Sequence, residues 1–179
     1  MKLFPIRFLI VLLLLSAKLV MDQPTRIDYK DVNKKLTQTI DSIVVYKSQR
    51  IMKVFHEGKL EKYYPISLGI EPSGRKQFEG DLRTPEGLYV INGRNKWSSY
   101  HKNLAISYPN VMDSLSARML GQSPGGEIKI HGFPNKHRID QEAELLSSDW
   151  TVGCIAVSDA EIDELYMWVG LYCPILILP

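Results

Sequence analysis

The sequence predicts a single, mostly β domain with a few helices. From residue 42 onward, short runs rich in β-branched and aromatic residues recur, and each closes on glycine, proline or another turn residue. One further segment has the periodicity and capping signature of an amphipathic helix. The chain has 179 residues, of which 45% are apolar, so it is long enough for one hydrophobic core and too short for two well-stabilised ones.

The predicted strands follow one another along most of the chain. The glycine-rich stretch at 124–126 leads into a run of alternating apolar and polar residues. The last run has proline at both ends, as strands at a sheet boundary often do. The runs are SIVVYK (42–47), RIMKVFHEG (50–58), LEKYYPISLG (60–69), GLYVING (87–93), NLAISYP (103–109), EIKIHG (127–132) and PILILP (174–179).

One helix is predicted after residue 158. Ser158 and Glu161 have the spacing of a capping box, in which each side chain satisfies a free amide of the first turn. Gly170 supplies a stop signal. The apolar positions between them share one helical face that is expected to pack on the sheet: Ile162, Leu165, Tyr166 and Val169.

The N-terminal residues 1–21 are predicted to be an export signal. Lys2 and Arg7 precede an uninterrupted apolar run from Phe8 to Leu15, which is short for a membrane span and typical of a signal peptide. An uncleaved short membrane anchor is the alternative, because Ser16 and Ala17 are adjacent rather than spaced as a cleavage site requires. Polar residues 22–41 are predicted to be a linker, and residues 42–179 the domain.

Charge and histidine spacing narrow the set of partners. The 22 basic and 20 acidic residues are scattered and give a net charge of +2, without the basic stripe that nucleic-acid binding requires. His56, His101 and His137 lack metal-ligand spacing to one another or to the cysteines. We therefore expect neither nucleic acid nor a metal or organic cofactor, and the sequence leaves the oligomeric state open.

Two residues have the chemistry of a nucleophile and its base. Cys154 follows Gly153 on a predicted turn just before the capped helix, where its sulfur can be exposed beside backbone N–H groups. His131 ends an alternating strand, where an imidazole can accept a thiol proton near neutral pH. From these two residues alone, a catalytic pair is a weaker interpretation than a buried cysteine and a histidine unrelated to it.

Several ordered motifs resemble the catalytic domain of the L,D-transpeptidases, the YkuD-type family. His131-Gly132 is followed by a loop and then by Thr151-Val152-Gly153-Cys154-Ile155. Upstream stand PISLG at 65–69, GDLRTPEGLYV at 80–90 and ISYPN at 106–110. The resemblance covers about residues 42–179 and is greatest to a murein L,D-transpeptidase-like branch of Gram-negative bacteria. It implies a β-sandwich-like fold in which a helix follows the catalytic cysteine.

The resemblance also implies a role for each matching residue. Cys154 is similar to the nucleophile and His131 to the general base, with the Gly132 carbonyl orienting the imidazole. The Gly153 and Cys154 amides would form an oxyanion hole, and Thr151 would shape the nucleophile turn. Cys154 would form a thioester with a peptidoglycan stem tetrapeptide at diaminopimelate, release D-alanine and transfer the stem to an amine of another stem, a D-amino acid or an envelope lipoprotein. Such an enzyme would act outside the cytoplasm, in the periplasm or cell envelope.

Two features depart from the family pattern, and three other functions stay open. Val152 and Ala156 replace polar residues beside the cysteine, and the charged loop at 133–150 is long, either as a substrate lid or as a solvated surface loop. Water could resolve the thioester, giving a peptidoglycan hydrolase or an amidase that releases lipoprotein. A non-catalytic peptidoglycan-binding module is the second alternative. An exported domain with a Cys154–Cys173 disulfide is the third.

Overall fold

The computed structural model describes residues 34–179. The predicted signal or anchor and residues 22–33 of the predicted linker lie outside this range. The remainder of the linker packs onto the domain, because Leu36 and Ile40 are buried in its core. Ile40 also forms a β-bridge with Val169.

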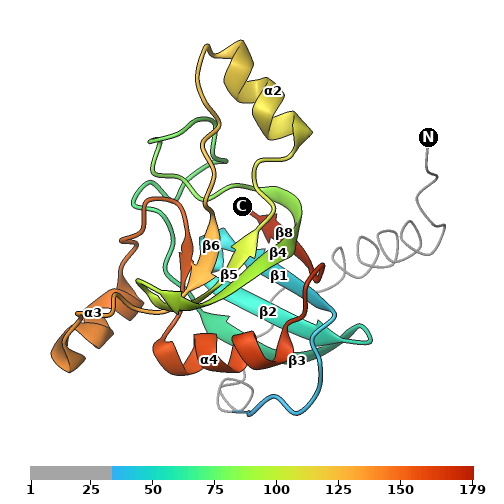
Figure 1. Cartoon of the computed structure of the whole chain (residues 1–179), viewed down its shortest axis with the longest axis vertical. Helices are drawn as coiled ribbons and strands as arrows, with labels where there is room; N and C mark the ends of the chain where they lie inside the picture. Colours follow the sequence, from blue (N-terminus) through green and yellow to red (C-terminus); the bar gives the residue numbers. More distant parts are fainter. Residues whose placement is uncertain (1–33) are drawn as a thin grey trace. The chain divides into compact units, whose positions relative to one another are not determined.

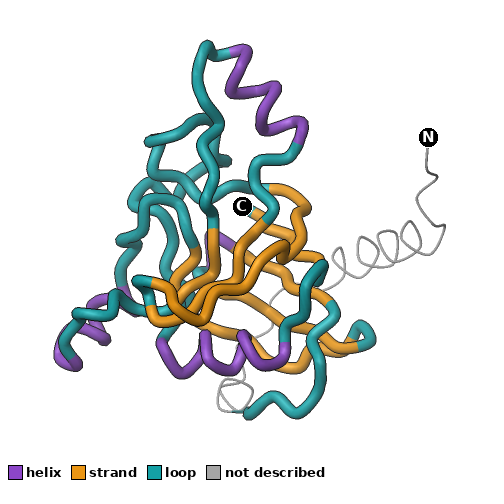
Figure 2. The backbone as a smooth tube through the Cα atoms, viewed as in Figure 1, coloured by secondary structure: helices purple, strands orange, loops and turns teal. Residues whose placement is uncertain are grey.

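An eight-stranded sheet forms the body of the domain (Figures 1 and 2), which confirms the mostly β prediction. The strand order is β3-β2-β1-β8-β4-β5-β6-β7. Neighbours are antiparallel except at β1–β8 and β6–β7, which are parallel. The strands are β1 (Ser42–Tyr46), β2 (Ile51–His56), β3 (Lys59–Pro65), β4 (Gly87–Ser98), β5 (His101–Ile106), β6 (Lys129–His131), β7 (Ile155–Ala156) and β8 (Pro174–Leu178).

The segment after β3 joins the two ends of this strand order. The strand predicted at 60–69 ends at Pro65, and the chain then reaches β7, where Ser67 and Ala156 exchange both backbone hydrogen bonds at 2.9 and 2.8 Å. Further along, Thr151 donates to the Leu68 carbonyl at 3.0 Å and accepts from the Ile70 amide at 2.9 Å. The sheet is therefore curled, and its closure lies beside residues 151–156.

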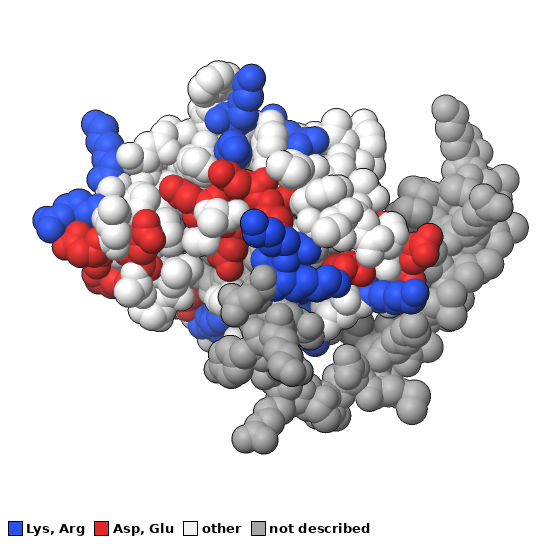
Figure 3. All heavy atoms as spheres, turned by 90° about the horizontal axis from the view of Figure 1, so that it is seen from below, with Lys and Arg blue, Asp and Glu red and all other residues white. Residues whose placement is uncertain are grey.

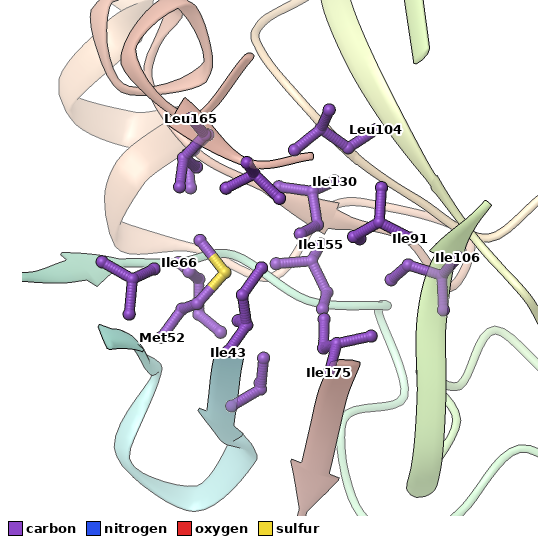
Figure 4. Packing of buried hydrophobic residues seen from close by; sticks show 14 of the residues in the cluster. Ile43, Met52, Ile66, Ile91, Leu104, Ile106, Ile130, Ile155, Leu165 and Ile175 are labelled. Atoms are coloured by element: carbon purple, nitrogen blue, oxygen red, sulfur yellow. The ribbon is translucent and has the colours of Figure 1, made fainter. Parts of the chain in front are cut away.

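The core fills the inside of the curled sheet. Side chains from strands far apart in the sequence point toward one another, and Leu165 joins them from a helix (Figure 4). Burying such side chains contributes roughly 1.5–3 kcal/mol each. The labelled members are Ile43, Met52, Ile66, Ile91, Leu104, Ile106, Ile130, Ile155, Leu165 and Ile175.

The predicted helix is present as α4 (Asp159–Trp168), with the Ser158–Glu161 capping box formed. The helix ends at Trp168, so Val169, the last residue of the predicted apolar face, lies just beyond it in extended backbone. Two helices were not predicted. One is α2 (Val111–Met119), capped by Asn110 and Asp113, and the other is α3 (Glu142–Ser147). Short 3-10 helices occupy Lys47–Gln49 (η1) and Ile139–Gln141 (η2).

The surface carries mixed charge. On the face shown in Figure 3, basic and acidic side chains are interspersed rather than gathered by sign. Within residues 34–179, no helix has the length and apolar character that crossing a membrane requires.

Packing of α4 on the sheet predicts a contrast between two residues of that helix. Leu165 is completely buried, so Leu165→Ala is expected to lower the free energy of unfolding by about 2–5 kcal/mol through lost burial and a cavity. Met167 is 72% exposed, and Met167→Ala is expected to change it by less than about 0.5 kcal/mol. Urea denaturation measures both, and equal losses would contradict the packing.

Candidate active site

A cleft of about 360 Å³ opens beside β4, β5 and β6. Three of the residues singled out from the sequence line it together: Cys154, His131 and Thr151. Other parts of its wall are aromatic or polar, and they include Trp97, Tyr100, Asn103, Glu127, Lys129 and Trp150. The structure thus brings the two predicted reactive side chains into one accessible space.

His131 is the last residue of β6 and is 5% exposed. Its Nδ1 atom lies 2.7 Å from the Gly132 carbonyl oxygen, the contact predicted from the sequence. A carbonyl oxygen can only accept, so Nδ1 carries the proton and Nε2 keeps a free lone pair. The rings of Tyr100 and Trp150 pack against the imidazole, with centroids 4.6 and 5.6 Å away. These contacts fix both the tautomer and the orientation of the ring.

Burial sets the protonation state of this imidazole. Removal from water lowers the pKa of His131 below its ordinary value, and the charge of Lys129 acts in the same direction. The hydrogen bond to Gly132 opposes this shift only in part. His131 is consequently neutral at neutral pH, the form in which it can accept a proton.

The Thr151 hydroxyl holds the turn that carries the cysteine. It donates to the Cys154 carbonyl at 2.8 Å and accepts from the Gly153 amide at 3.1 Å. The Gly153 amide, predicted from the sequence to point into an oxyanion hole, is thereby used within the turn. Gly153 has a φ of 133°, a conformation that residues with a side chain rarely adopt.

Backbone from two distant segments lies directly behind the turn. A Cβ atom on Gly153 would stand 2.8 Å from the Arg83 carbonyl oxygen, and one on Gly69 would stand 2.1 Å from the Leu82 carbonyl oxygen. Thr84 accepts a hydrogen bond from the Gly69 amide at 3.1 Å. The GDLRTPEG and PISLG motifs therefore meet at this point, where they support the cysteine from behind.

A buried lysine, not anticipated from the sequence, holds one of these segments. The Lys47 ammonium donates to the carbonyls of Gly74 and Thr84, at 2.6 and 3.0 Å, and to the Glu86 carboxylate at 2.8 Å. Burial lowers the pKa of Lys47, against the opposing effect of Glu86. Its three donors are all used, so it ties the 74–86 segment to the end of β1.

The Cys154 thiol donates to the Glu127 carbonyl at 3.5 Å. Burial raises the pKa of Cys154 above its ordinary value, although the Lys129 amide and charge act in the opposite direction. Because the pKa of His131 shifts downward, the resting pair is a neutral thiol and a neutral imidazole. A thiolate–imidazolium pair is thus not the favoured resting state.

The second cysteine is not joined to the first. Both thiols are free, which contradicts the disulfide alternative. Cys173 is buried in the core, where burial raises its pKa to about 12. It packs as a small apolar side chain.

Residues 40–177 match the family model described as the L,D-transpeptidase catalytic domain, YkuD. The chain belongs to this family. The putative L,D-transpeptidase YafK of Escherichia coli K12 is 25% identical over 148 residues, which are 78% of this chain and 51% of YafK. The chain thus spans about half the length of the curated relatives it matches.

Solved structures share the fold of this chain. The helical cell shape determining protein Pgp2 of Campylobacter jejuni is 27% identical, with a TM-score of 0.58 over 82% of this chain and 51% of Pgp2. An L,D-transpeptidase of Xylanimonas cellulosilytica, 12% identical, has a TM-score of 0.51 over 79% of this chain and 62% of that structure. This second likeness concerns the fold alone.

The residues that depart from the family pattern have different surroundings. Val152 is exposed at the cleft, whereas Ala156 is buried in β7 and is out of reach of a substrate. The loop at 133–150 contains η2 and α3, and it ends at Trp150 in the cleft wall. The Leu145 carbonyl anchors it by accepting from the Trp150 ring and the Ser67 hydroxyl, at 3.0 and 2.6 Å.

Other conspicuous side chains have structural partners. Arg94 donates to the Tyr166 carbonyl and lies over the Tyr166 ring, which attaches β4 to α4. Within residues 34–179, no group of three or more His, Cys, Asp or Glu side chains is arranged to hold a metal ion.

Sequence reasoning missed several polar residues of the cleft, among them Lys129, Asn103 and Glu127. Lys129 stands two positions before His131 on one strand, so strand alternation could have placed both on the same face. Asn103 and Glu127 give no such signal, because their places depend on the strand register and on the turn before β6.

The pKa shifts predict how the two cysteines react with iodoacetamide. In the native protein, Cys154 is expected to be alkylated and Cys173 protected, because the latter is buried and the thiolate is the reactive form. Because burial raises the pKa of Cys154 above its ordinary value, its alkylation rate should keep rising with pH through the range in which a free thiol titrates. Peptide mass mapping measures both sites, and a plateau below pH 8 would contradict a neutral resting thiol.

Proposed function

We propose that this chain is a peptidoglycan L,D-transpeptidase in which Cys154 is the nucleophile and His131 the general base. The observation that carries the proposal is the shared cleft, in which a partly accessible thiol and a neutral imidazole with a free Nε2 lie on adjoining elements. Membership of the L,D-transpeptidase family supports it. The substrate we propose is the stem tetrapeptide, cleaved between diaminopimelate and D-alanine.

In the proposed reaction, proton transfer and attack occur together. Rotation of the Cys154 side chain away from the Glu127 carbonyl frees the thiol, and His131 Nε2 accepts its proton as sulfur attacks the carbonyl carbon. The imidazolium then protonates the departing D-alanine amine, leaving a thioester on Cys154. An incoming amine attacks the thioester, gives its proton to His131 and expels the thiol.

The oxyanion of each tetrahedral intermediate needs a preorganised donor. Because the Gly153 amide already donates to Thr151, we assign this role to the Cys154 amide, and Gly153 to shaping the turn. Removing one donor of this kind costs about 2.7–4 kcal/mol of barrier in other enzymes. The turn geometry around Thr151 is therefore part of the proposed catalytic arrangement.

The setting of the reaction is part of the proposal. An exported enzyme, delivered by the signal or retained by an anchor at residues 1–21, would meet peptidoglycan stems in the periplasm or cell envelope. Other stems, D-amino acids or an envelope lipoprotein would supply the amine.

Product analysis with two matched cysteine variants tests the proposed function. Wild-type protein incubated with tetrapeptide muropeptides is expected to release D-alanine and form new cross-links. Cys154→Ala should lose at least about a thousandfold in rate, because no other group replaces the nucleophile. Cys173→Ala removes the buried thiol and should keep the activity. Mass spectrometry of the products distinguishes transfer from hydrolysis; net cleavage without transfer would replace the transferase with the hydrolase or amidase, and inertness would favour the binding module.

A carbapenem tests the nucleophile without a natural substrate. The strained β-lactam amide is expected to acylate Cys154, so intact-protein mass should increase by the mass of one carbapenem molecule. Cys173→Ala should give the same adduct and Cys154→Ala none. An unchanged wild-type mass at neutral pH would contradict the assignment.

A further inference from the structure

Polar side chains from the paired strands β5 and β6 line the cleft beside His131. Asn103 of β5 pairs directly with His131 of β6, and Ala105 pairs with Lys129. Side chains two positions apart on a strand point to the same face, so Lys129 and His131 face the cleft together. Asn103, Lys129 and His131 all line it.

Asn103 is the first residue of this wall that could contact a ligand. The residue is 5% exposed and lines the cleft. Within residues 34–179, no buried side-chain N or O atom lacks a hydrogen-bond partner, so Asn103 contributes by its place in the cleft wall. Asn103 lies on β5 opposite His131 of β6, and its side-chain amide can offer two N–H donors and one acceptor to a molecule in the cleft.

Glu127 and Lys129 add one charge of each sign beside the sulfur. Their side chains pair at 2.6 Å and both line the cleft, with 86% and 30% exposure. Such an exposed pair is weak and is easily opened by a competing ligand. Glu127 has a φ of 60°, a left-handed conformation, and its carbonyl contacts the Cys154 thiol. The charge pair therefore adjoins the reacting atom.

We infer that Asn103, Glu127 and Lys129 form a subsite for a zwitterionic amino-acid centre, a carbon that carries both an ammonium and a carboxylate group. Glu127 accepts from the ammonium, while Lys129 and the Asn103 amide donate to the carboxylate. The inference rests on the proposed function, in which the stem peptide carries such a centre at the far end of its diaminopimelate side chain.

The donor stem fits this subsite better than the attacking amine does. An amine held by the Glu127 carboxylate stays protonated and has no lone pair with which to attack a thioester. The centre bound here is therefore a spectator that positions the donor. By this geometry, the residues select stems by the third amino acid rather than by the leaving D-alanine.

Binding to Cys154→Ala protein tests the subsite independently of catalysis. Calorimetry compares two tetrapeptides that differ only at the third residue, which is meso-diaminopimelate in one and L-lysine in the other. Lysine keeps the ammonium and lacks the carboxylate. The diaminopimelate peptide is expected to bind at least about tenfold more tightly, because a charged hydrogen-bonded contact is absent from the other.

Three further substitutions, each added to the Cys154→Ala protein, separate the roles of the subsite residues. Lys129→Met should lower the affinity ratio, because only the Asn103 amide then donates to the carboxylate. Glu127→Gln should weaken both peptides, since both carry the ammonium. Lys59→Met, an exposed lysine of β3 outside the cleft, should leave the ratio unchanged. Melting temperatures of all variants verify folding.

The outcomes distinguish this inference from the proposed function. Equal affinities for the two peptides, or a ratio that survives Lys129→Met, overturn the subsite. Turnover of both peptides by the intact enzyme without preference would also reject the subsite while leaving the transpeptidase in place. A binding preference without any turnover would support the subsite and count against the proposed reaction.

Discussion

The site depends on a close approach of backbones that leaves no room for a side chain. Gly69, Gly153 and the Leu82–Arg83 peptides lie so near one another that a single Cβ atom would overlap a carbonyl oxygen. This contact joins the closure of the curled sheet to the cysteine turn. Thr84 and Lys47 then tie the supporting segment to β1, so the position of the sulfur is set by parts of the chain that are far from it in sequence.

Desolvation sets the electrostatics of the site. It disfavours the charged form of both reactive groups, raising the pKa of the thiol and lowering that of the imidazole. The result is a neutral pair, which in the proposed reaction would become charged only as the thiol attacks. The Gly132 carbonyl and two aromatic rings hold the imidazole in place. In the proposed reaction, Nε2 would therefore be the atom that accepts the thiol proton.

Patterns within short stretches of the sequence were enough to predict several features of the fold and of the site. The main strands, the capped helix and the pairing of Cys154 with His131 in one cleft follow from alternation, capping and ordered motifs. The end of β3 at Pro65 could not be foreseen, because residues 66–69 continue the strand pattern but pair with the far end of the sheet. The use of the Gly153 amide by Thr151 and the place of Asn103 beside His131 depend on tertiary contacts that have no sequence signature.

The burial of Cys173 has a consequence for redox chemistry. In an oxidising compartment, a cysteine that becomes a sulfenic acid is commonly rescued by a neighbouring thiol, but the other thiol of this chain is enclosed in the core. Rescue of Cys154 would therefore fall to an external reductant. Peroxides attack the thiolate, so a thiol that stays protonated at rest is oxidised slowly. In the proposed reaction, the burial that delays nucleophilic attack until a substrate arrives would also protect the sulfur from oxidation between turnovers.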